Sequence, residues 1–384
     1  MAVIRFGIIG VGGMGMAHVK NVVAMKGARV SAVCDVVEAR AKTAAETAAG
    51  SKMFVDYREL VDSGLADAVI VATPHYWHSP IAICAMKKGL HVISEKPLGV
   101  TLTAVDKMIA TAKRTGVKFA VMLQWRTGGL WQTAKRVIRS GRLGELRRVH
   151  YVFPDYRPQA YYEQDAWRGT WAGEGGGVLV NQAPHFTDML WYLAGEPRTV
   201  IARTRTRLHQ IEVEDEAEAI VEYPNGATGH YYTCTCEFPG RHYVRFAGDR
   251  AVLDIEGGKL RLGKLKTPLG KFDRTNREPW GNPGADWVEV PVKERKRQGH
   301  IGIVQNFVDA INRGTKLIAP GEEGIHQVEM TCAMILSSKK SKPVTLPVDR
   351  KEYDRLMATL ARESTGKKGA VKGVHRTKVV THFT

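Results

Sequence analysis

A glycine-rich segment near the start of the chain has the spacing of a turn that binds nucleotide phosphates. It reads Gly10-Val11-Gly12-Gly13-Met14-Gly15, follows an apolar run typical of a strand, and opens a helix-like segment. In this setting Gly10 permits a tight turn, Gly12 lets the backbone approach a pyrophosphate, and Gly15 lets the helix pack closely on the sheet. We therefore expect residues 10–15 to bind a dinucleotide at a helix N-terminus.

An acidic residue at the end of the second predicted strand indicates which dinucleotide binds. Asp35 lies twenty residues after Gly15. Its carboxylate can accept hydrogen bonds from an adenosine ribose diol and would repel a 2′-phosphate, so it favours NAD over NADP. Arg40, five residues further on, keeps NADP open because an arginine there could accommodate that phosphate.

A lysine follows another predicted strand, at the edge where a parallel sheet binds its ligands. The segment reads Ser94-Glu95-Lys96-Pro97. Ligands of open parallel sheets bind outside the carboxyl ends of the strands, so Lys96 would lie beside the cofactor. A cationic amine there can stabilise a developing alkoxide. The alternative is an ordinary surface lysine in a Lys-Pro turn.

A group of polar residues lies in an otherwise apolar segment after the glycine run 175–177. If a helix begins just after the glycines, Asn181, His185 and Asp188 share one face, because they are spaced by four and three. Pro184 would lie in or near the first turn, where its missing N–H costs little. His185 could then act as a general base near neutral pH. A buried core or capping histidine is the alternative.

The elements that must position these residues alternate between strands and helices over the first 123 residues. Amphipathic segments such as Thr101–Thr115 separate five apolar runs. The runs are Val3–Ile9, Arg29–Cys34, Ala68–Ala72, His91–Ser94 and Val117–Leu123. This alternation predicts an α/β Rossmann domain, a parallel doubly wound sheet with helices on both faces, over residues 1–123.

The pattern changes after about residue 124. Charged and apolar residues alternate over Asp215–Tyr223, and Asn225-Gly226 is a hairpin signal that leads into His230–Cys236. Helix-like segments follow at His300–Asn312, Glu322–Ser338 and Arg350–Glu363. We expect an α+β domain with a large, mainly antiparallel open sheet over residues 124–345, then a C-terminal helix and basic tail over 346–384.

Composition excludes several classes of protein. The 384 residues are 44% hydrophobic and 25% charged, as in a soluble globular protein, and no apolar run approaches the ~20 residues of a membrane span. No signal peptide and no disulfide framework are expected, which favours the cytoplasm. Cys234 and Cys236 lack a second ligand pair, so no metal site is predicted. The net charge of +17, concentrated in part in the tail and at Lys293–Arg297, comes with no nucleic-acid motif.

The order of the motifs resembles the Gfo/Idh/MocA family of oxidoreductases. The matching segments are GIIGVGGMG, Asp35, ATPHYWH (Ala72–His78), HVISEKPL (His91–Leu98) and GGGVLVNQAPHFTDML. The resemblance covers roughly residues 3–340. It implies a Rossmann domain plus an open-sheet domain, an NAD or NADP cofactor, and oxidation or reduction of alcohols on sugars and cyclitols.

The resemblance also implies roles for individual residues. The lysine of EKP and the histidine of a D-x-x-x-H helix work beside the nicotinamide, and these positions match Lys96 and His185. The Lys96–Pro97 bond is expected to be cis. Asn181 stands where many members have aspartate, so His185 would lack an anionic partner, and Asn181 would orient His185 or the substrate. An asparagine often stands at the position of His75.

Further contacts are expected on both sides of the site. Cofactor contacts beyond the turn, Asp35 and Arg40 are predicted for Thr73, Pro74, His75, His78, Glu95, Lys96 and Gln124, although His78 could equally cap the following helix. Substrate contacts are predicted for Lys96, Arg126, Tyr161, Trp167, Arg168, Asn181 and His185. Aromatic rings beside hydrogen-bonding groups suit sugars, and domain-interface core is the alternative for these rings.

Together these features predict an NAD-dependent dehydrogenase that oxidises a secondary hydroxyl of a sugar, glycoside or cyclitol. A redox-neutral, NAD-retaining glycoside-cleaving enzyme and a non-catalytic nucleotide-sensing regulator are the alternatives. We also expect a homodimer or homotetramer that associates through an exposed face of the second sheet. Tyr231, Thr233 and Thr235 of its middle strand are expected on that face, opposite Tyr232, Cys234 and Cys236. No nucleic-acid or membrane partner is expected.

Overall fold

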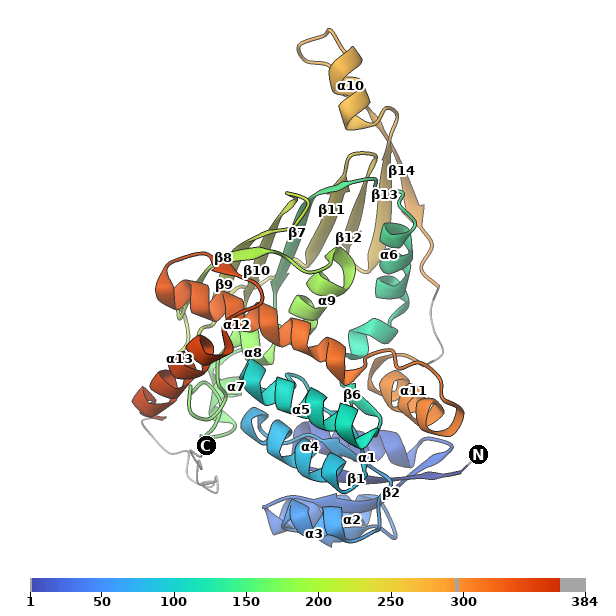
Figure 1. Cartoon of the computed structure of the whole chain (residues 1–384), viewed down its shortest axis with the longest axis vertical. Helices are drawn as coiled ribbons and strands as arrows, with labels where there is room; N and C mark the ends of the chain where they lie inside the picture. Colours follow the sequence, from blue (N-terminus) through green and yellow to red (C-terminus); the bar gives the residue numbers. More distant parts are fainter. Residues whose placement is uncertain (1, 294–296, 367–384) are drawn as a thin grey trace.

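A computed structural model describes residues 2–293 and 297–366, which form two sheets with helices packed on them (Figure 1). The first sheet has six strands and the second has nine. In the described ranges, no helix has the length and apolar character needed to cross a membrane. Most of the predicted basic tail and the centre of the Lys293–Arg297 cluster lie outside the described residues.

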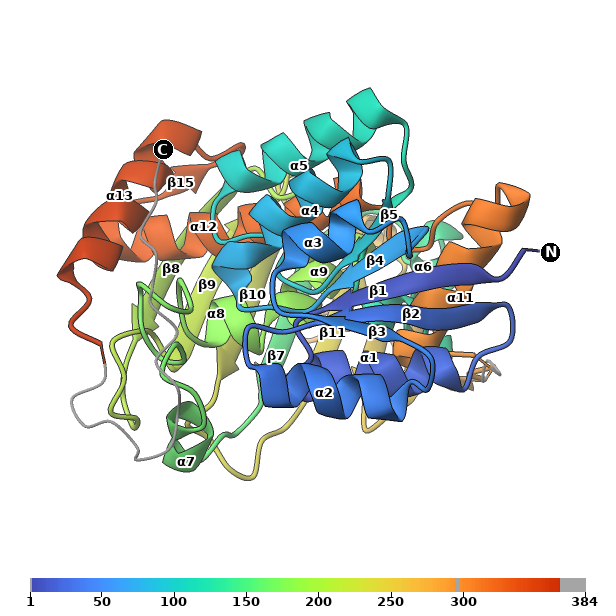
Figure 2. The same ribbon diagram turned by 90° about the horizontal axis from the view of Figure 1, so that it is seen from below.

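The first sheet is entirely parallel, in the order β3-β2-β1-β4-β5-β6. Its strands are β1 (Ile4–Ile9), β2 (Ala28–Cys34), β3 (Lys52–Phe54), β4 (Ala68–Val71), β5 (His91–Ser94) and β6 (Phe119–Val121). Its helices are α1 (Gly13–Val23), α2 (Glu38–Thr47), α3 (Tyr57–Asp62), α4 (His78–Lys87) and α5 (Leu102–Thr115). Figure 2 shows α1 and α2 on one face and α3, α4 and α5 on the other, which is the predicted doubly wound arrangement.

Local sequence explains most of these boundaries. The helix predicted at Thr101–Thr115 is α5, in which Thr101 caps the start by accepting a hydrogen bond from the Ala104 amide. Gly116 ends it at φ 71°, a conformation that favours glycine. The sequence prediction missed β3, a three-residue strand in which only Phe54 is buried.

The second sheet is mixed, in the order β14-β13-β12-β11-β7-β10-β9-β8-β15, and all its pairs are antiparallel except β10 with β7. Its strands are β7 (Leu146–Pro154), β8 (Thr199–Arg205), β9 (Glu216–Glu222), β10 (Thr228–Cys234), β11 (Tyr243–Gly248), β12 (Ala251–Glu256), β13 (Lys259–Leu265), β14 (Ala285–Val290) and β15 (Val344–Thr345). The mainly antiparallel second sheet is therefore confirmed, and the Asn225-Gly226 turn joins β9 to β10 as predicted.

Helices cover only one face of this sheet (Figure 1). They include α6 (Gly129–Arg139), α8 (Val178–Asn181), α9 (Pro184–Ala194) and α12 (Gly324–Lys340), while α7 (Gln159–Glu163) and α10 (Leu269–Thr275) lie in connections. Tyr231, Thr233 and Thr235 are completely buried. The prediction that these three residues lie on an exposed face is therefore wrong: the partly exposed residues are Tyr232 and Cys236 of the opposite row, in which Cys234 is buried.

The C-terminal part of the chain packs on both domains. The predicted helices correspond to α11 (Gly299–Arg313), α12 and α13 (Arg350–Glu363). Helix α11 packs on α1, and α12 packs on α5 as well as on β8 and α9. The Val121 amide at the edge strand β6 donates to the Ala319 oxygen at 3.0 Å, so this returning segment pairs with the edge of the first sheet.

Candidate active site

The glycine-rich turn leaves open space where a pyrophosphate would lie. Gly10 has φ +83°, and a Cβ on Gly15 would lie 1.7 Å from the Gly10 oxygen, so both positions require glycine. By contrast, a Cβ on Gly13 would contact nothing within 4 Å. A cavity of about 490 Å³ lies beside the turn and is lined by Val11, Gly12, Gly13, Met16, Ala39, Arg40, Thr43 and Asp165. The start of α1 thus faces a space that can take the phosphates.

Asp35 is held in a fixed orientation at the end of β2. One carboxylate oxygen accepts from the Val11 amide and the other from the Val37 amide, both at 2.9 Å. Each oxygen keeps a further lone pair, so the carboxylate can still accept from a ribose diol. Arg40 extends toward the same turn, with Nη1 4.0 Å from the position of a Cβ on Gly12.

Lys96 crosses from the first domain to the second. Its Nζ donates to the main-chain oxygen of Asn181 at 2.7 Å, and the Lys96–Pro97 bond is cis, as the resemblance implied. Behind it, Glu95 binds His18, whose Nε2 lies 2.7 Å from Oε1. Burial alone would raise the pKa of Glu95, but the hydrogen bond and charge of His18 and the charge of Lys96 lower it to about 2. Glu95 Oε2 also accepts from the Lys96 amide at 3.1 Å, so the carboxylate is held between His18 and the backbone of Lys96.

His185 is a buried, neutral histidine at the start of α9. Burial and the charge of Lys96 lower the pKa of His185 to about 3, so the ring is uncharged at neutral pH. Gln124 Nε2 donates to His185 Nε2 at 3.0 Å, which places the remaining ring proton on Nδ1. Gln124 follows β6, so this contact also joins the two domains.

The helix expected after the glycine run is broken in two. Helix α8 ends at Asn181, and α9 begins at Pro184, which occupies the first turn as predicted. Asn181 and His185 therefore do not share the face of one continuous helix. The Asn181 side chain donates to Glu174 and Tyr161, not to His185, so the expectation that it orients His185 is not supported.

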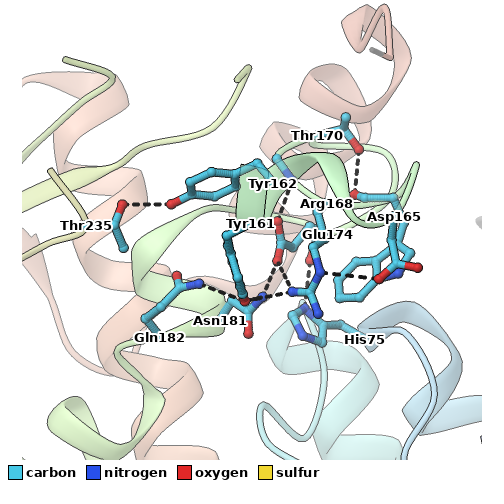
Figure 3. A network of polar contacts seen from close by, with 12 residues as sticks. His75, Tyr161, Tyr162, Asp165, Arg168, Thr170, Glu174, Asn181, Gln182 and Thr235 are labelled. Atoms are coloured by element: carbon cyan, nitrogen blue, oxygen red, sulfur yellow. Dashed lines mark hydrogen bonds and ion pairs between the residues drawn. The ribbon is translucent and has the colours of Figure 1, made fainter. Parts of the chain in front are cut away.

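A polar network surrounds Asn181 on the substrate side (Figure 3). The Tyr161 hydroxyl accepts from Arg168 at 2.7 Å, from Gln182 at 3.0 Å and from Asn181 at 3.2 Å. The Arg168 guanidinium lies over the Trp167 ring at 4.5 Å. The structure thus brings four predicted substrate residues, Tyr161, Trp167, Arg168 and Asn181, into one cluster.

Arg126, also predicted to bind substrate, lies elsewhere. Its side chain is completely buried, with two hydrogen bonds to Asp188 at 2.6 and 2.9 Å and another to Glu323. Because these carboxylates accept the hydrogen bonds of the guanidinium, Arg126 has a structural role: it fixes η2 (Gln124–Thr127) on α9. The prediction that Arg126 contacts substrate is not supported by this geometry.

The segment after β4 lies between the two domains. His75 donates through Nδ1 to the Glu174 main-chain oxygen at 3.0 Å, and burial holds the pKa of His75 well below its ordinary value. Both ring nitrogens of His78 lie 2.7 Å from carbonyl oxygens, those of Thr73 and Pro97. His78 therefore joins the loops after β4 and β5, and neither of its nitrogens is left for a cofactor.

Several buried polar atoms around this site have no partner among the described residues. They are Thr73 Oγ1, Gln124 Oε1, Gln182 Oε1 and His185 Nδ1. Buried polar groups are normally hydrogen-bonded, and a carboxamide or a hydroxyl-rich ligand could satisfy such atoms. Together with the open glycine turn, these atoms fit a dinucleotide and a polyol bound side by side.

The sequence prediction missed three residues of the site. His18 and His300 lie edge to face, 5.5 Å apart, behind Glu95, and Glu174 contacts Asn181. His18 and Glu95 are 77 residues apart, and no local pattern links them. Within the described residues, no cluster of three side chains could hold a metal ion.

Comparison with known families matches both halves of the chain. Residues 4–123 match the family described as oxidoreductase family, NAD-binding Rossmann fold (GFO_IDH_MocA). Residues 131–254 match the GFO/IDH/MocA C-terminal domain.

Individual relatives show which proteins the chain resembles. Myo-inositol 2-dehydrogenase of Thermotoga maritima is 26% identical and covers 88% of this chain and 96% of its own length. The crystal structure of the WlbA dehydrogenase from Chromobacterium violaceum, in complex with NADH and UDP-GlcNAcA, is similar with a TM-score of 0.80 and 26% identity, over 91% of this chain and 97% of that one. α-N-acetylgalactosaminidase of Shewanella oneidensis is 34% identical, over only 38% of this chain and 34% of its own.

Proposed function

Because this chain belongs to the Gfo/Idh/MocA oxidoreductase family and has its NAD-binding Rossmann domain, we propose that it oxidises a secondary hydroxyl of a sugar, glycoside or cyclitol. NAD bound in the cavity beside the glycine turn supplies the hydride acceptor. The observation that carries the proposal is a pair of contacts between the domains. Lys96, which follows β5, donates to the Asn181 main-chain oxygen at 2.7 Å, and Gln124, which follows β6, lies 3.0 Å from His185 Nε2. These contacts hold Lys96 and His185 at the carboxyl-end edge of the parallel sheet.

His185 takes the hydroxyl proton. Burial and the charge of Lys96 lower its pKa, so Nε2 is unprotonated near neutrality. The ring can hold the proton only as the negative charge that develops on the substrate oxygen offsets the charge of Lys96. The Gln124 amide occupies that lone pair here, at the position where a substrate hydroxyl would donate. Substrate binding then releases Gln124 Nε2 from His185. The Gln124 Oε1 atom, which has no partner among the described residues, can accept a hydrogen bond from the substrate or the cofactor.

Lys96 stabilises the negative charge that develops on the substrate oxygen. Burial lowers the pKa of Lys96, while the Glu95 and Glu174 carboxylates oppose that shift. A fixed ammonium in a site of low polarity stabilises an oxyanion more strongly than the same charge does in water. Lys96 and His185 together argue against the alternative of a non-catalytic regulator, which would need neither.

Trp167, Tyr161 and Arg168 offer a surface suited to a hydroxylated ring. The Trp167 ring lies 5.4 Å from that of His75, and hydrogen-bonding groups lie around it. Apolar C–H faces of a pyranose or cyclitol can stack on an aromatic ring while their hydroxyls bind the polar neighbours. The similarity to a myo-inositol 2-dehydrogenase and to a dehydrogenase crystallised with NADH and UDP-GlcNAcA supports this substrate class.

A glycoside-cleaving enzyme that oxidises its sugar only transiently is the second candidate. It is favoured by the similarity of 38% of the chain to an α-N-acetylgalactosaminidase. The two functions differ in their products. A dehydrogenase accumulates one NADH for each substrate consumed, whereas a redox-neutral enzyme releases an aglycone with no net change in absorbance at the NADH band.

The experiment is a screen of sugars, glycosides and cyclitols with NAD, monitored by NADH absorbance and, in parallel, by release of an aglycone. NADH formation with at least one polyol supports the dehydrogenase. Aglycone release without NADH supports the second candidate, and neither product with any compound contradicts both.

The chain is also proposed to form a homodimer, or a tetramer built from dimers, through the uncovered face of the second sheet. On that face Ile201 of β8 lies opposite Ile220 of β9, and both are more than half exposed. A two-fold arrangement needs only one self-complementary patch. A cytoplasmic location fits the five cysteines, all of which are free.

A further inference from the structure

A buried carboxylate next to the site has no role in the mechanism described so far. Glu174 is only 1% exposed. One of its carboxylate oxygens accepts from the Asn181 side chain, and the other accepts from the Gly169 amide at 2.5 Å. Figure 3 shows Glu174 beneath the cluster, between Arg168 and Asn181. A carboxylate this deeply buried is rare unless something compensates its charge.

Several charged or titratable groups face this carboxylate from the surrounding segments. The Arg168 Nη1 lies 3.9 Å from Oε1, and the charge of Lys96 also acts on it. The Glu214 carboxylate, just before β9, repels the Glu174 carboxylate. Burial and the charge of Glu174 raise the pKa of Tyr162. The neutral His75 ring donates a hydrogen bond to the main-chain oxygen of Glu174. Burial raises the pKa of Glu174 to about 7, and the Gly169 amide, Arg168, Asn181 and Lys96 oppose the rise.

Asn181 links this carboxylate to the catalytic lysine. Its main-chain oxygen accepts from Lys96 Nζ, and its side-chain Nδ2 donates to both Glu174 and Tyr161. Above about pH 7, where Glu174 is mainly ionised, its carboxylate accepts hydrogen bonds only, so Glu174 determines that Nδ2, and not Oδ1, points toward it. The Asn181 oxygen Oδ1 is then available to accept from a substrate hydroxyl.

On the side of Lys96 that faces Asn181, no carboxylate accepts a hydrogen bond from the ammonium among the described residues. Its direct hydrogen bond runs to an uncharged main-chain oxygen, and Glu95, on the other side, is bound to His18. Glu95 and Glu174 are the two carboxylates that favour the charged form of Lys96, against its burial and the repulsion from Arg168 and Arg157. Asparagine at position 181 supplies no charge of its own.

We propose that Glu174 is a positioning residue that supplies the negative charge on the substrate side of Lys96 and, through Asn181, fixes the amide that receives the substrate hydroxyl. The inference rests on the proposed function, in which Lys96 acts as a cation. Glu174 does not touch the reacting atoms, and it transfers no proton in this scheme.

The first test measures the ionisation of Lys96 directly, in the protein without substrate. Glu174→Gln keeps the shape of the side chain and removes its charge, so the pKa of Lys96 should fall. At pH 8 the rate of reductive methylation of Lys96, followed by mass spectrometry, should then rise by about three- to tenfold, since one pKa unit corresponds to tenfold in the free-amine fraction. Glu163→Gln, an exposed change in α7, is the matched control and should leave the rate unchanged. An unchanged rate in Glu174→Gln would overturn the proposal.

The second test moves the negative charge from position 174 to position 181, the two residues that are hydrogen-bonded to each other. In the double variant Glu174→Gln with Asn181→Asp, the glutamine amide can donate to the aspartate, which restores a carboxylate beside Lys96. We expect the labelling rate of Lys96 to return to within about twofold of the unmodified protein. If Glu174→Gln alone does not fold, this variant carries the test, and a labelling rate that stays high would contradict the proposal.

Turnover provides the readout that connects the charge to catalysis. Glu174→Gln should lower kcat about tenfold and leave the affinity for NAD unchanged, and the double variant should recover most of the loss. A protein that forms no NADH with any polyol would disprove the proposed function, yet the labelling of Lys96 would still decide the role of Glu174. The two failures are therefore distinguishable.

Discussion

The side-chain nitrogen of Lys96 lies 2.7 Å from the main-chain oxygen of Asn181, although the two residues are 85 positions apart and belong to different domains. The Lys96 ammonium is thus held by the second domain. Because the main-chain oxygen cannot move without α8, any displacement of α8 relative to β5 would move Lys96 as well. Catalysis should therefore be sensitive to single side chains here, in ways that cofactor binding is not.

Removal of either catalytic side chain should abolish most turnover. Lys96→Ala and His185→Ala should each lower kcat by about 10² or more, because each removes a group that acts in the transition state. The dissociation constant for NADH, measured by fluorescence titration, should change by less than about fivefold, since neither residue belongs to the glycine turn. Turnover close to that of the unmodified protein would exclude the altered residue from the mechanism.

Arg126→Met should lower the stability of the protein, in contrast to the Lys96 and His185 variants, which should lower turnover. Arg126 is enclosed by Asp188 and Glu323, so its loss leaves the Asp188 carboxylate buried without its partner. The melting temperature should fall by several degrees, with an unfolding penalty on the order of 3 kcal/mol. A folded variant with normal stability and a raised KM would restore the view that Arg126 binds substrate.

Cofactor preference should depend on Asp35. NAD should bind more tightly than NADP, and Asp35→Ala should narrow the difference, because the carboxylate that repels a 2′-phosphate is removed. Calorimetric titration of both dinucleotides into both proteins measures the change. Since Asp35 also accepts from the Val11 and Val37 amides, Asp35→Asn is the better-tolerated second variant. Stronger binding of NADP by the unmodified protein would contradict the argument from the ribose diol.

The stability of the protein should fall as the pH rises through neutrality, in part because of Glu214. Burial raises the pKa of Glu214 from 4.5 to about 7, so between these values the folded state holds more protons than the unfolded state. The free energy of unfolding therefore decreases with rising pH in this window. Glu214→Gln, whose side-chain oxygen can still accept from the Gly177 and Leu179 amides, should gain on the order of 1–3 kcal/mol relative to the unmodified protein between pH 5 and pH 8. Urea denaturation at the two pH values tests this, and a pH-independent difference would refute it.

Association through the uncovered face of the second sheet should be visible in solution. Light scattering at micromolar concentration should give at least twice the mass of 42.5 kDa expected for one chain. Ile220→Arg should weaken the assembly, because it places a charge in the apolar patch that Ile220 forms with Ile201. Val36→Arg, a change at a still more exposed apolar residue of the first domain, should have no effect. A mass near that of a single chain for the unmodified protein would exclude the proposed assembly.

Features encoded in short segments could be predicted from the sequence. The turn at residues 10–15, the strands that flank it, and α5 with its threonine cap depend on neighbours within a few positions. So does Pro184 at the start of α9, although the break between α8 and α9 was not predicted. The start of α8 depends on close packing of distant backbone, since a Cβ on Gly177 would lie 1.8 Å from the Glu214 oxygen.

Features that depend on distant partners could not be predicted. Arg126 follows the last strand of the first domain and was expected to reach a ligand, but its carboxylates lie 62 and 197 positions away. Glu174 gave no signal, because its importance comes from burial and from contacts with Asn181 and Arg168 that form only in the folded chain. The exposed face of β10 was assigned to the wrong row of residues, since alternation alone does not tell which row faces the helices.

Helix α12, nearly buried along its length, packs on α5 of the first domain and on β8 and α9 of the second. A hinge motion between the domains would have to break these contacts, so we expect the two domains to behave as one rigid body. Radii of gyration from small-angle X-ray scattering should then agree within error with and without NADH.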